Sequence, residues 1–90
     1  MRQIRLSGRE LTVLKALGFA EAVLGEQIRE QTQIQPDDLT DVLNALLAAG
    51  YVESRPYHEQ VTTTEMASTE FEVNPGYIHE LRSSMKRSWV

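Results

Sequence analysis

The sequence predicts a small domain that is mainly α-helical and carries one antiparallel β-hairpin, an α+β fold. Residues 36–49 place apolar side chains at the i, i+3, i+4 spacing of an amphipathic helix. Gly50 follows where a helix can end in the left-handed conformation, and residues 51–52 begin an extended run. Asn74 and Pro75 combine a helix cap with a proline suited to the first helical turn, which predicts another helix after the hairpin.

Length and composition limit what the chain can be. Its 90 residues suit one domain, near the lower end of sizes that fold without disulfides or metals. With 41% hydrophobic and 24% charged residues, the composition is typical of globular proteins. The absence of cysteine excludes disulfides and thiolate metal sites. The longest apolar run, residues 45–49, is too short for a membrane span or a signal peptide. From these absences we expect a cytoplasmic protein with no membrane partner.

The net charge of −4 is unevenly distributed along the chain. Both ends are basic, whereas residues 21–41 and 53–72 are strongly acidic. The basic side chains of the two ends are either ordinary solvated charges or, if the ends are neighbours, one basic patch; they are Arg2, Arg5, Arg9, Arg82, Lys86 and Arg87.

The first helix is predicted over residues 7–17. Ser7 and Glu10 have the spacing of a capping box, in which each side chain accepts a hydrogen bond from the other residue's backbone N–H. Gly18 is a suitable terminator. The predicted buried stripe consists of Leu11, Leu14 and Leu17, with Val13 at its edge.

Two more helices are predicted before the hairpin. Residues 24–31 form a short helix with Leu24 and Ile28 facing inward, after an apolar connection at residues 19–23. Residues 36–49 form the third helix, with Asp37 in its first turn, where the helix dipole favours negative charge. The core-facing residues of this third helix are Leu39, Val42, Leu43, Leu46 and Leu47.

The hairpin and a last helix complete the chain. Residues 51–55 and 68–73 are predicted strands, and residues 56–67 a polar loop between them. Residues 75–87 form the final helix. Its apolar stripe either packs on its own domain or forms the face of a homodimer; the stripe is Ile78, Leu81, Met85 and Trp89.

Three segments carry a family resemblance. LSGRELTVLKAL resembles the first helix of bacterial and archaeal winged-helix transcription regulators, LTDVLNALLAAGYVESR resembles their recognition helix and first wing strand, and FEVNPGYIHEL is similar to the segment that closes the wing. The resemblance spans residues 6–82. It implies a winged helix-turn-helix domain over residues 1–90, with a three-helix core, a wing and a C-terminal helix.

The resemblance also implies a DNA-binding surface. In such regulators the third helix enters the major groove and the wing reaches the neighbouring backbone or minor groove. Transferred to this sequence, the third helix and its preceding turn supply the groove-facing candidates Gln33, Gln35, Thr40, Asp41 and Asn44, and the wing supplies Arg55, His58 and Gln60. Asn and Gln can read adenine, and arginine can hold a phosphate or a guanine.

The sequence departs from this pattern in its charge. The third helix has three aspartates and no lysine or arginine, whereas DNA-binding surfaces gain affinity from cations placed on phosphates. Two functions therefore remain open: a small DNA-binding regulator acting as a dimer, and an acidic interaction module that binds a basic protein and no DNA. A third hypothesis is that the chain is one part of a larger assembly whose basic partner supplies the DNA contacts.

Enzymatic function is not predicted. His58 and His79 are far apart and neither belongs to a metal-ligand spacing. The sequence has no phosphate-binding glycine loop, no nucleophile elbow and no cysteine nucleophile. We therefore expect no catalytic residues, no metal and no cofactor.

Overall fold

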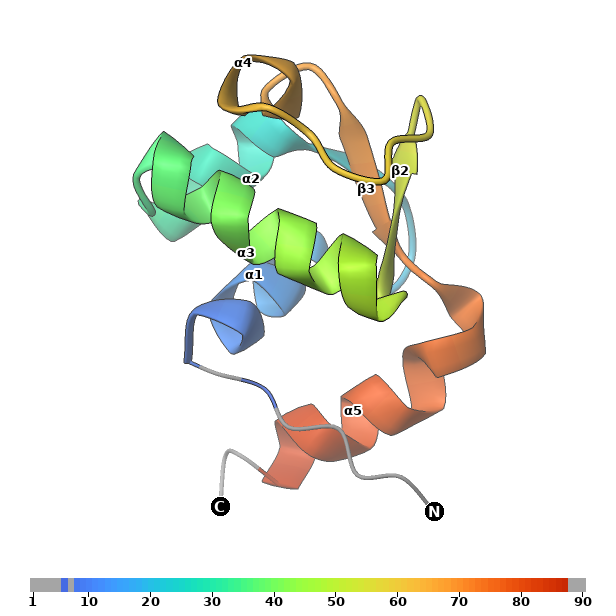
Figure 1. Ribbon diagram of the computed structural model, residues 1–90. Coiled ribbons are helices and arrows are strands. Elements are labelled where there is room, and N and C mark those ends of the chain that lie inside the picture. The colour runs from blue at the N-terminus through green and yellow to red at the C-terminus, as the bar shows by residue number, and fades with distance from the viewer. Residues whose placement is uncertain (1–5, 7, 88–90) are drawn as a thin grey trace.

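The helix α3 (Pro36–Ala49) runs through the middle of the molecule, and the other elements are arranged around it (Figure 1). The computed structural model describes residue 6 and residues 8–87, with side chains up to residue 84. Leu39, Leu43 and Leu46 are completely buried, and Val42 and Leu47 are partly buried against the same core. The helix ends at Gly50 with a φ of 82°. Both the bounds and the buried stripe predicted for this helix are confirmed.

Helices α1 (Gly8–Leu17) and α2 (Gly25–Thr32) pack around α3 and contribute Val13, Leu14, Leu17 and Ile28 to the core. Both helices lie within one residue of their predicted positions. The predicted cap at Ser7 lies outside the described residues. Leu24 does not face inward as predicted: it is 38% exposed, because it belongs to a strand that precedes α2.

The sheet has three antiparallel strands in the order β1-β3-β2, formed by β1 (Val23–Leu24), β2 (Val52–Arg55) and β3 (Glu70–Val73). The β2–β3 hairpin confirms the two predicted strands, and its register pairs Val52 with Val73 and Ser54 with Phe71. Phe71 and Val73 are buried, as their alternation predicts. The strand β1 was not predicted, because two residues are too few to show a pattern and its pairing with β3 is non-local.

The connection between β2 and β3 contains a one-turn helix, α4 (Thr63–Met66), where the sequence predicted only a polar loop. A capping box forms it: the Thr62 hydroxyl accepts a hydrogen bond from the Glu65 N–H at 3.1 Å, and the Glu65 carboxylate accepts one from the Thr62 N–H at 3.0 Å. Met66 is 1% exposed. The connection is therefore an ordered part of the core packing.

Gly25 lies where α2 and the end of α4 are in close contact. Its N–H donates a hydrogen bond to the Thr69 carbonyl at 2.9 Å. A Cβ atom on Gly25 would be 1.9 Å from the Met66 carbonyl oxygen, so no larger residue fits without backbone movement. This close contact fixes α4 against the start of α2.

The last helix begins with a 3₁₀ turn, Pro75–Tyr77, and continues as α5 (Ile78–Arg87), which confirms the predicted span. Asn74 caps it by accepting a hydrogen bond from the Gly76 N–H at 3.0 Å. The same side chain donates a hydrogen bond to the Gly50 carbonyl at 2.8 Å. One asparagine therefore joins the end of α3 to the start of the last helix.

The apolar stripe of α5 packs on its own domain as far as its side chains are described. Leu81 is completely buried and Ile78 is partly buried against the core. For Leu81 the structure therefore shows the first of the two alternatives, packing on its own domain. The side chain of Met85 and all of Trp89 lie outside the described residues.

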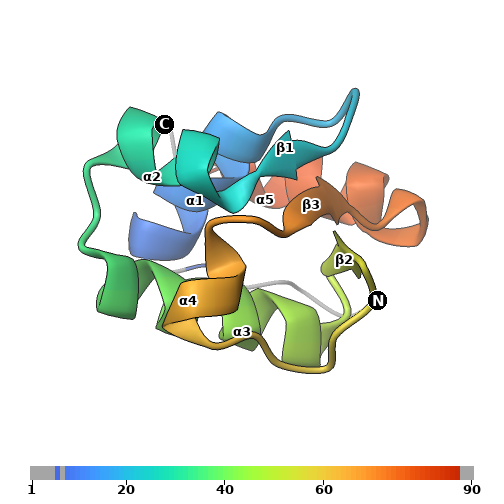
Figure 2. The ribbon, with the colours of Figure 1, turned by 90° about the horizontal axis from the view of Figure 1, so that it is seen from above.

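The elements form a small compact α+β domain. The Cα radius of gyration is 12.1 Å, and a compact chain of this length has a value of about 12 Å. In Figure 2, α4 lies against α3. No helix in the described part of the chain is long and apolar enough to cross a membrane.

Candidate binding surface on α3 and the neighbouring groove

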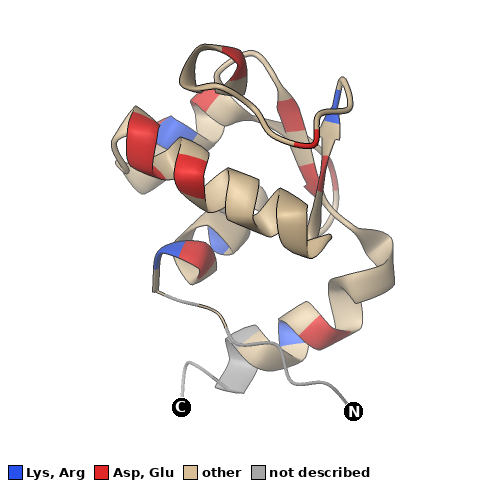
Figure 3. Cartoon of the chain, viewed as in Figure 1, with Lys and Arg blue, Asp and Glu red and all other residues tan. Residues whose placement is uncertain are grey.

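The exposed side of α3 includes a narrow line of four residues: Asp37, Asp41, Ala45 and Ala48. Their spacing of four, four and three residues places them in one line along the helix. We call this line the α3 stripe. Its first half is acidic and its second half carries only methyl side chains, which leaves the backbone accessible to a partner. Figure 3 shows this division, with acidic residues near the start of α3 and uncharged residues near its end.

The negative charge of the stripe is not neutralised from within the domain. Arg9 lies 3.6 Å from Asp38, beside the stripe. Among the residues that the structure describes, no lysine or arginine forms an ion pair with Asp37 or Asp41. Between Arg29 and Arg82 in the sequence, Arg55 is the only basic residue apart from histidine.

A second side of α3 is covered by the segment that leads into α4. The Asn44 side chain donates a hydrogen bond to the Val61 carbonyl at 3.0 Å and accepts one from the Val61 N–H at 2.8 Å. The Thr63 hydroxyl donates to the Asp37 carboxylate at 3.2 Å. These contacts fix residues 61–63 on the helix.

This packing engages two of the predicted base-reading residues in hydrogen bonds within the fold. Asn44 uses its donor and its acceptor on Val61, so its amide is engaged within the fold. Thr40 was predicted to be exposed, but it is 5% exposed and its hydroxyl donates to the Pro36 carbonyl at 2.8 Å. Asp41 is exposed as predicted.

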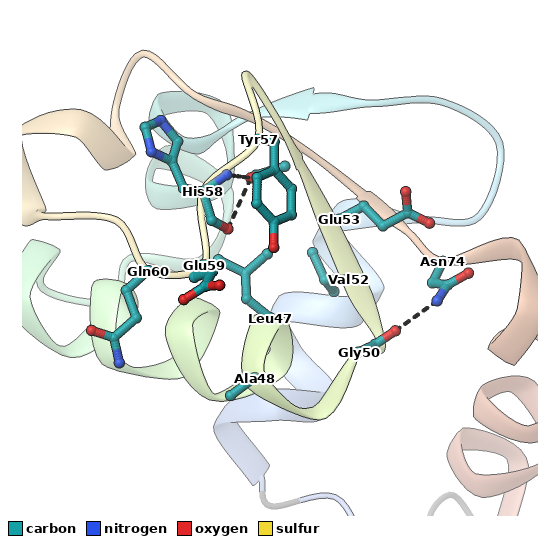
Figure 4. Close-up of a pocket in the computed structure, with 11 residues that line it drawn as sticks. Leu47, Ala48, Gly50, Val52, Glu53, Tyr57, His58, Glu59, Gln60 and Asn74 are labelled. Carbon is teal, nitrogen blue, oxygen red and sulfur yellow. Dashed lines mark hydrogen bonds between the residues drawn. The ribbon is translucent and has the colours of Figure 1, made fainter.

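A groove of about 690 Å³ opens where the α3 stripe ends. Its floor includes Leu47 and Ala48 from α3 and Val52 from β2. Tyr57 and Glu59 line it from the segment that follows β2 (Figure 4). Tyr57 is 78% exposed, more than the other exposed large hydrophobic residues of the described chain.

Hydrogen bonds hold the sides of the groove in place. The Ser54 hydroxyl accepts from the His58 N–H at 2.9 Å and donates to the Pro56 carbonyl at 3.1 Å, so the chain folds back beside β2. On the opposite side, Asn74 is bonded to Gly50 (Figure 4). The shape of the groove is therefore maintained by hydrogen bonds within the domain.

The charged side chains that line the groove are acidic. Glu53 and Glu59 are both exposed. Arg55 is the nearest basic residue in sequence, but its guanidinium donates to the Glu72 carboxylate at 2.8 Å across the hairpin. Arg55 was predicted to hold a phosphate, and in the structure it is exposed with this carboxylate as its partner.

The other predicted DNA contacts are scattered. Gln33 has a left-handed φ of 60° at the end of α2, and its side chain donates to the Glu30 carbonyl at 2.6 Å. Gln35 is exposed at the start of α3. Gln60 is exposed and lines the groove, and the His58 imidazole is directed away from Tyr57 (Figure 4). The structure brings His58 and Gln60 together, and it separates them from Gln33.

Two parts of this surface were missed in the sequence. The helical spacing places Asp37, Asp41, Ala45 and Ala48 away from the core, but it does not show that Ala48 also borders a groove. Tyr57 had no local signal, because an aromatic residue inside a polar segment shows neither a helical nor a strand period.

Three ionisable groups have shifted pKa values. The pKa of Glu65 is lowered, first because its carboxylate accepts a hydrogen bond from the Thr62 backbone and then because of the Thr62 side chain. The pKa of Glu26 is lowered by its hydrogen bond with Arg29, and the pKa of Arg29 is raised by the same contact. Each shift has a structural explanation in a cap or an ion pair, and none lies in the groove.

Within the described residues, no group of three or more His, Asp or Glu side chains is placed to hold a metal ion. No family model matches the chain, and no curated protein or solved structure is significantly similar to it.

Proposed function

We propose that the chain is a winged-helix-type domain that binds a basic segment of another protein along the α3 stripe. The order α1-β1-α2-α3-β2-β3 and the sheet order β1-β3-β2 support the winged-helix assignment. On this assignment α3 is the recognition helix and residues 56–69 form the wing. The observation that carries the functional part is the charge of that helix: its exposed line begins with two aspartates, and no lysine or arginine whose side chain the structure describes pairs with either of them.

Electrostatics favours a cationic protein segment over DNA. Each phosphate brought to Asp37 or Asp41 would be repelled, whereas an arginine or lysine would be attracted. Two of the residues best suited to base reading, Asn44 and Thr40, are engaged in hydrogen bonds within the fold. Ala45 and Ala48 make the second half of the stripe shallow enough for an extended chain to approach.

Duplex DNA remains the second candidate, because the element order favours it. The α2–α3 pair with a following hairpin is the arrangement that places a recognition helix in the major groove in DNA-binding proteins. Gln35 and Gln60 are exposed amides that would be free to contact bases.

Removal of negative charge from the α3 stripe distinguishes the two functions, because it should weaken the binding of a basic peptide and strengthen the binding of DNA. A double variant, Asp37→Asn with Asp41→Asn, is titrated with a fluorescent peptide alternating arginine and leucine and, separately, with a labelled DNA duplex. For protein binding, peptide affinity falls roughly five- to tenfold, because each exposed ion pair contributes about 0.2–1 kcal/mol. For DNA binding, the same variant binds duplex more tightly, because repulsion of phosphate is removed.

The matched control is Glu21→Gln with Glu30→Gln, which changes the net charge equally at exposed positions outside the α3 stripe. Circular dichroism verifies the fold, since loss of a first-turn aspartate weakens a helix by about 0.3–1 kcal/mol. A peptide that fails to bind at low salt, or that responds equally to both double variants, contradicts the proposal. Tighter duplex binding by the Asp37/Asp41 variant alone selects the DNA hypothesis.

A further inference from the structure

We infer that the groove at the end of the α3 stripe is the docking site for a bulky apolar side chain of the same basic segment, with Tyr57 as the residue that covers it. The inference rests on the proposed function and goes further, because it defines the partner as a segment in which arginine or lysine flanks a large aliphatic or aromatic residue.

The first argument is the exposure of Tyr57. A tyrosine that is 78% exposed leaves most of its ring in water, although the apolar side chains of Leu47 and Val52 lie in the same groove. Val52 is already buried, so an apolar side chain inserted here would remove from solvent the Tyr57 ring and the part of Leu47 that is still exposed. Tyrosine is among the residues most often found at the centre of protein interfaces.

The second argument is the charge around this apolar floor. Glu53 lies at one side of the groove and Glu59 at the other (Figure 4). Arg55, which would otherwise oppose a cationic ligand, is paired with Glu72 at 2.8 Å. An apolar residue flanked by positive charges complements this arrangement, and an acidic or phosphate-bearing ligand does not.

The third argument is continuity. Ala48 belongs both to the α3 stripe and to the groove, so the acidic start of the stripe and the apolar groove are parts of one surface. The 14 residues of α3 extend over about 21 Å. An extended peptide of six or seven residues spans a similar length, at about 3.3 Å per residue. A short segment can therefore reach Asp37 and the groove together.

The groove requires little reorganisation to receive such a ligand. Its sides are held by the bonds of Ser54 with residues 56–58 and by the bond between Asn74 and Gly50. The two hydrogen bonds between Asn44 and Val61 hold the chain that follows this groove segment on α3. Preorganisation of this kind lowers the entropic cost of binding.

The test compares three labelled heptapeptides on the intact chain: one alternating arginine and leucine, one in which glycine replaces leucine, and one in which glutamate replaces arginine. Fluorescence anisotropy gives each Kd at low salt. We expect the arginine–leucine peptide to bind about tenfold more tightly than the arginine–glycine peptide, the size of effect expected for one buried anchor. The glutamate–leucine peptide should not bind.

Tyr57→Ala is the diagnostic variant, because this exposed side chain contributes little to folding. It should weaken the arginine–leucine peptide about tenfold and leave the arginine–glycine peptide unchanged. Glu59→Gln should weaken both arginine peptides roughly threefold, the scale of one exposed ion pair. Glu30→Gln, the same change on α2, is the control and should alter neither.

The outcomes separate the inference from the function on which it rests. If both arginine peptides bind and Tyr57→Ala affects them equally or not at all, the docking site is wrong and the acidic-surface function stands. If neither arginine peptide binds, both fail. If a labelled duplex, or a second copy of the chain seen by sedimentation, competes for the Tyr57 site instead, the partner class is wrong.

Discussion

Substitution of Asn44 separates a structural role from a base-reading role. Asn44→Ala removes two hydrogen bonds, at 3.0 and 2.8 Å, between α3 and the backbone of Val61. Each such bond contributes about 0.5–1.5 kcal/mol, and Val61, at 4% exposed, then has backbone groups poorly placed to bond with water. We therefore expect the free energy of unfolding to fall by about 2–3 kcal/mol.

Thermal unfolding followed by circular dichroism measures this change. A loss of 1 kcal/mol lowers the Tm of a domain of this size by about 4–8 °C, so the expected decrease is on the order of 10 °C or more. Amide hydrogen exchange at Val61 should accelerate in the same variant. Gln60→Ala is the control, since this exposed amide lies on the same segment, and its Tm should stay within about 2 °C of the wild type, a surface-mutation effect.

A base-reading Asn44 predicts the reverse pattern. The Tm of Asn44→Ala would then be close to that of Gln60→Ala, while affinity for a DNA duplex would fall. That result would refute the claim that the asparagine serves to hold residues 61–63 on α3.

Three further predictions follow from packing and capping. Gly25→Ala should lower the free energy of unfolding in urea by more than 2 kcal/mol, since the new Cβ would lie 1.9 Å from the Met66 carbonyl oxygen. A decrease of less than about 1 kcal/mol, close to that of an ordinary surface substitution, would show that the backbone relaxes freely. Phe71→Ala, at a completely buried position, should cost about 3–5 kcal/mol by the same assay. The hydrogen bonds from Thr62 lower the pKa of Glu65 below its usual value of 4.5, so the ionised carboxylate stabilises the fold above pH 4.5 and this stabilisation is lost as the pH falls through the lowered pKa. The free energy of unfolding, measured from pH 6 to 2, should therefore decline less steeply in Glu65→Gln than in the wild type. Parallel curves would contradict this prediction.

Much of the fold was predictable because several elements carry strong local signals. The α3 helix has an uninterrupted apolar stripe, a proline at its start and a glycine at its end, and its predicted bounds are those observed. The Asn74 cap likewise located the last helix. These signals depend on residues within a few positions of one another, so the sequence alone contains them.

The unpredicted parts depend on contacts between distant residues. The strand β1 exists because Val23 and Leu24 pair with β3, nearly 50 residues later. The α4 turn had one local signal, the spacing of Thr62 and Glu65, which matches a capping box and was overlooked. Asn44 bonds to the backbone of Val61 because the segment that leads into α4 packs on α3. No sequence pattern near Asn44 indicates this contact.

The sequence predicts the charge of the candidate surface but does not predict its shape. The absence of basic residues from α3 is evident in the sequence and kept a cationic protein partner open beside DNA. The groove requires Tyr57, Val52 and Leu47 to lie together, and this depends on the chain folding back beside β2 through Ser54.

Asn74 occupies a position that few other side chains could fill. It must donate to the Gly50 carbonyl and accept from the Gly76 N–H at the same time. Aspartate lacks the donor, serine is too short to span both partners, and glutamine adds a methylene that displaces its amide. The stereochemistry of a single amide therefore sets the direction in which the chain enters the last helix, and the burial of Leu81 then holds that helix on the domain.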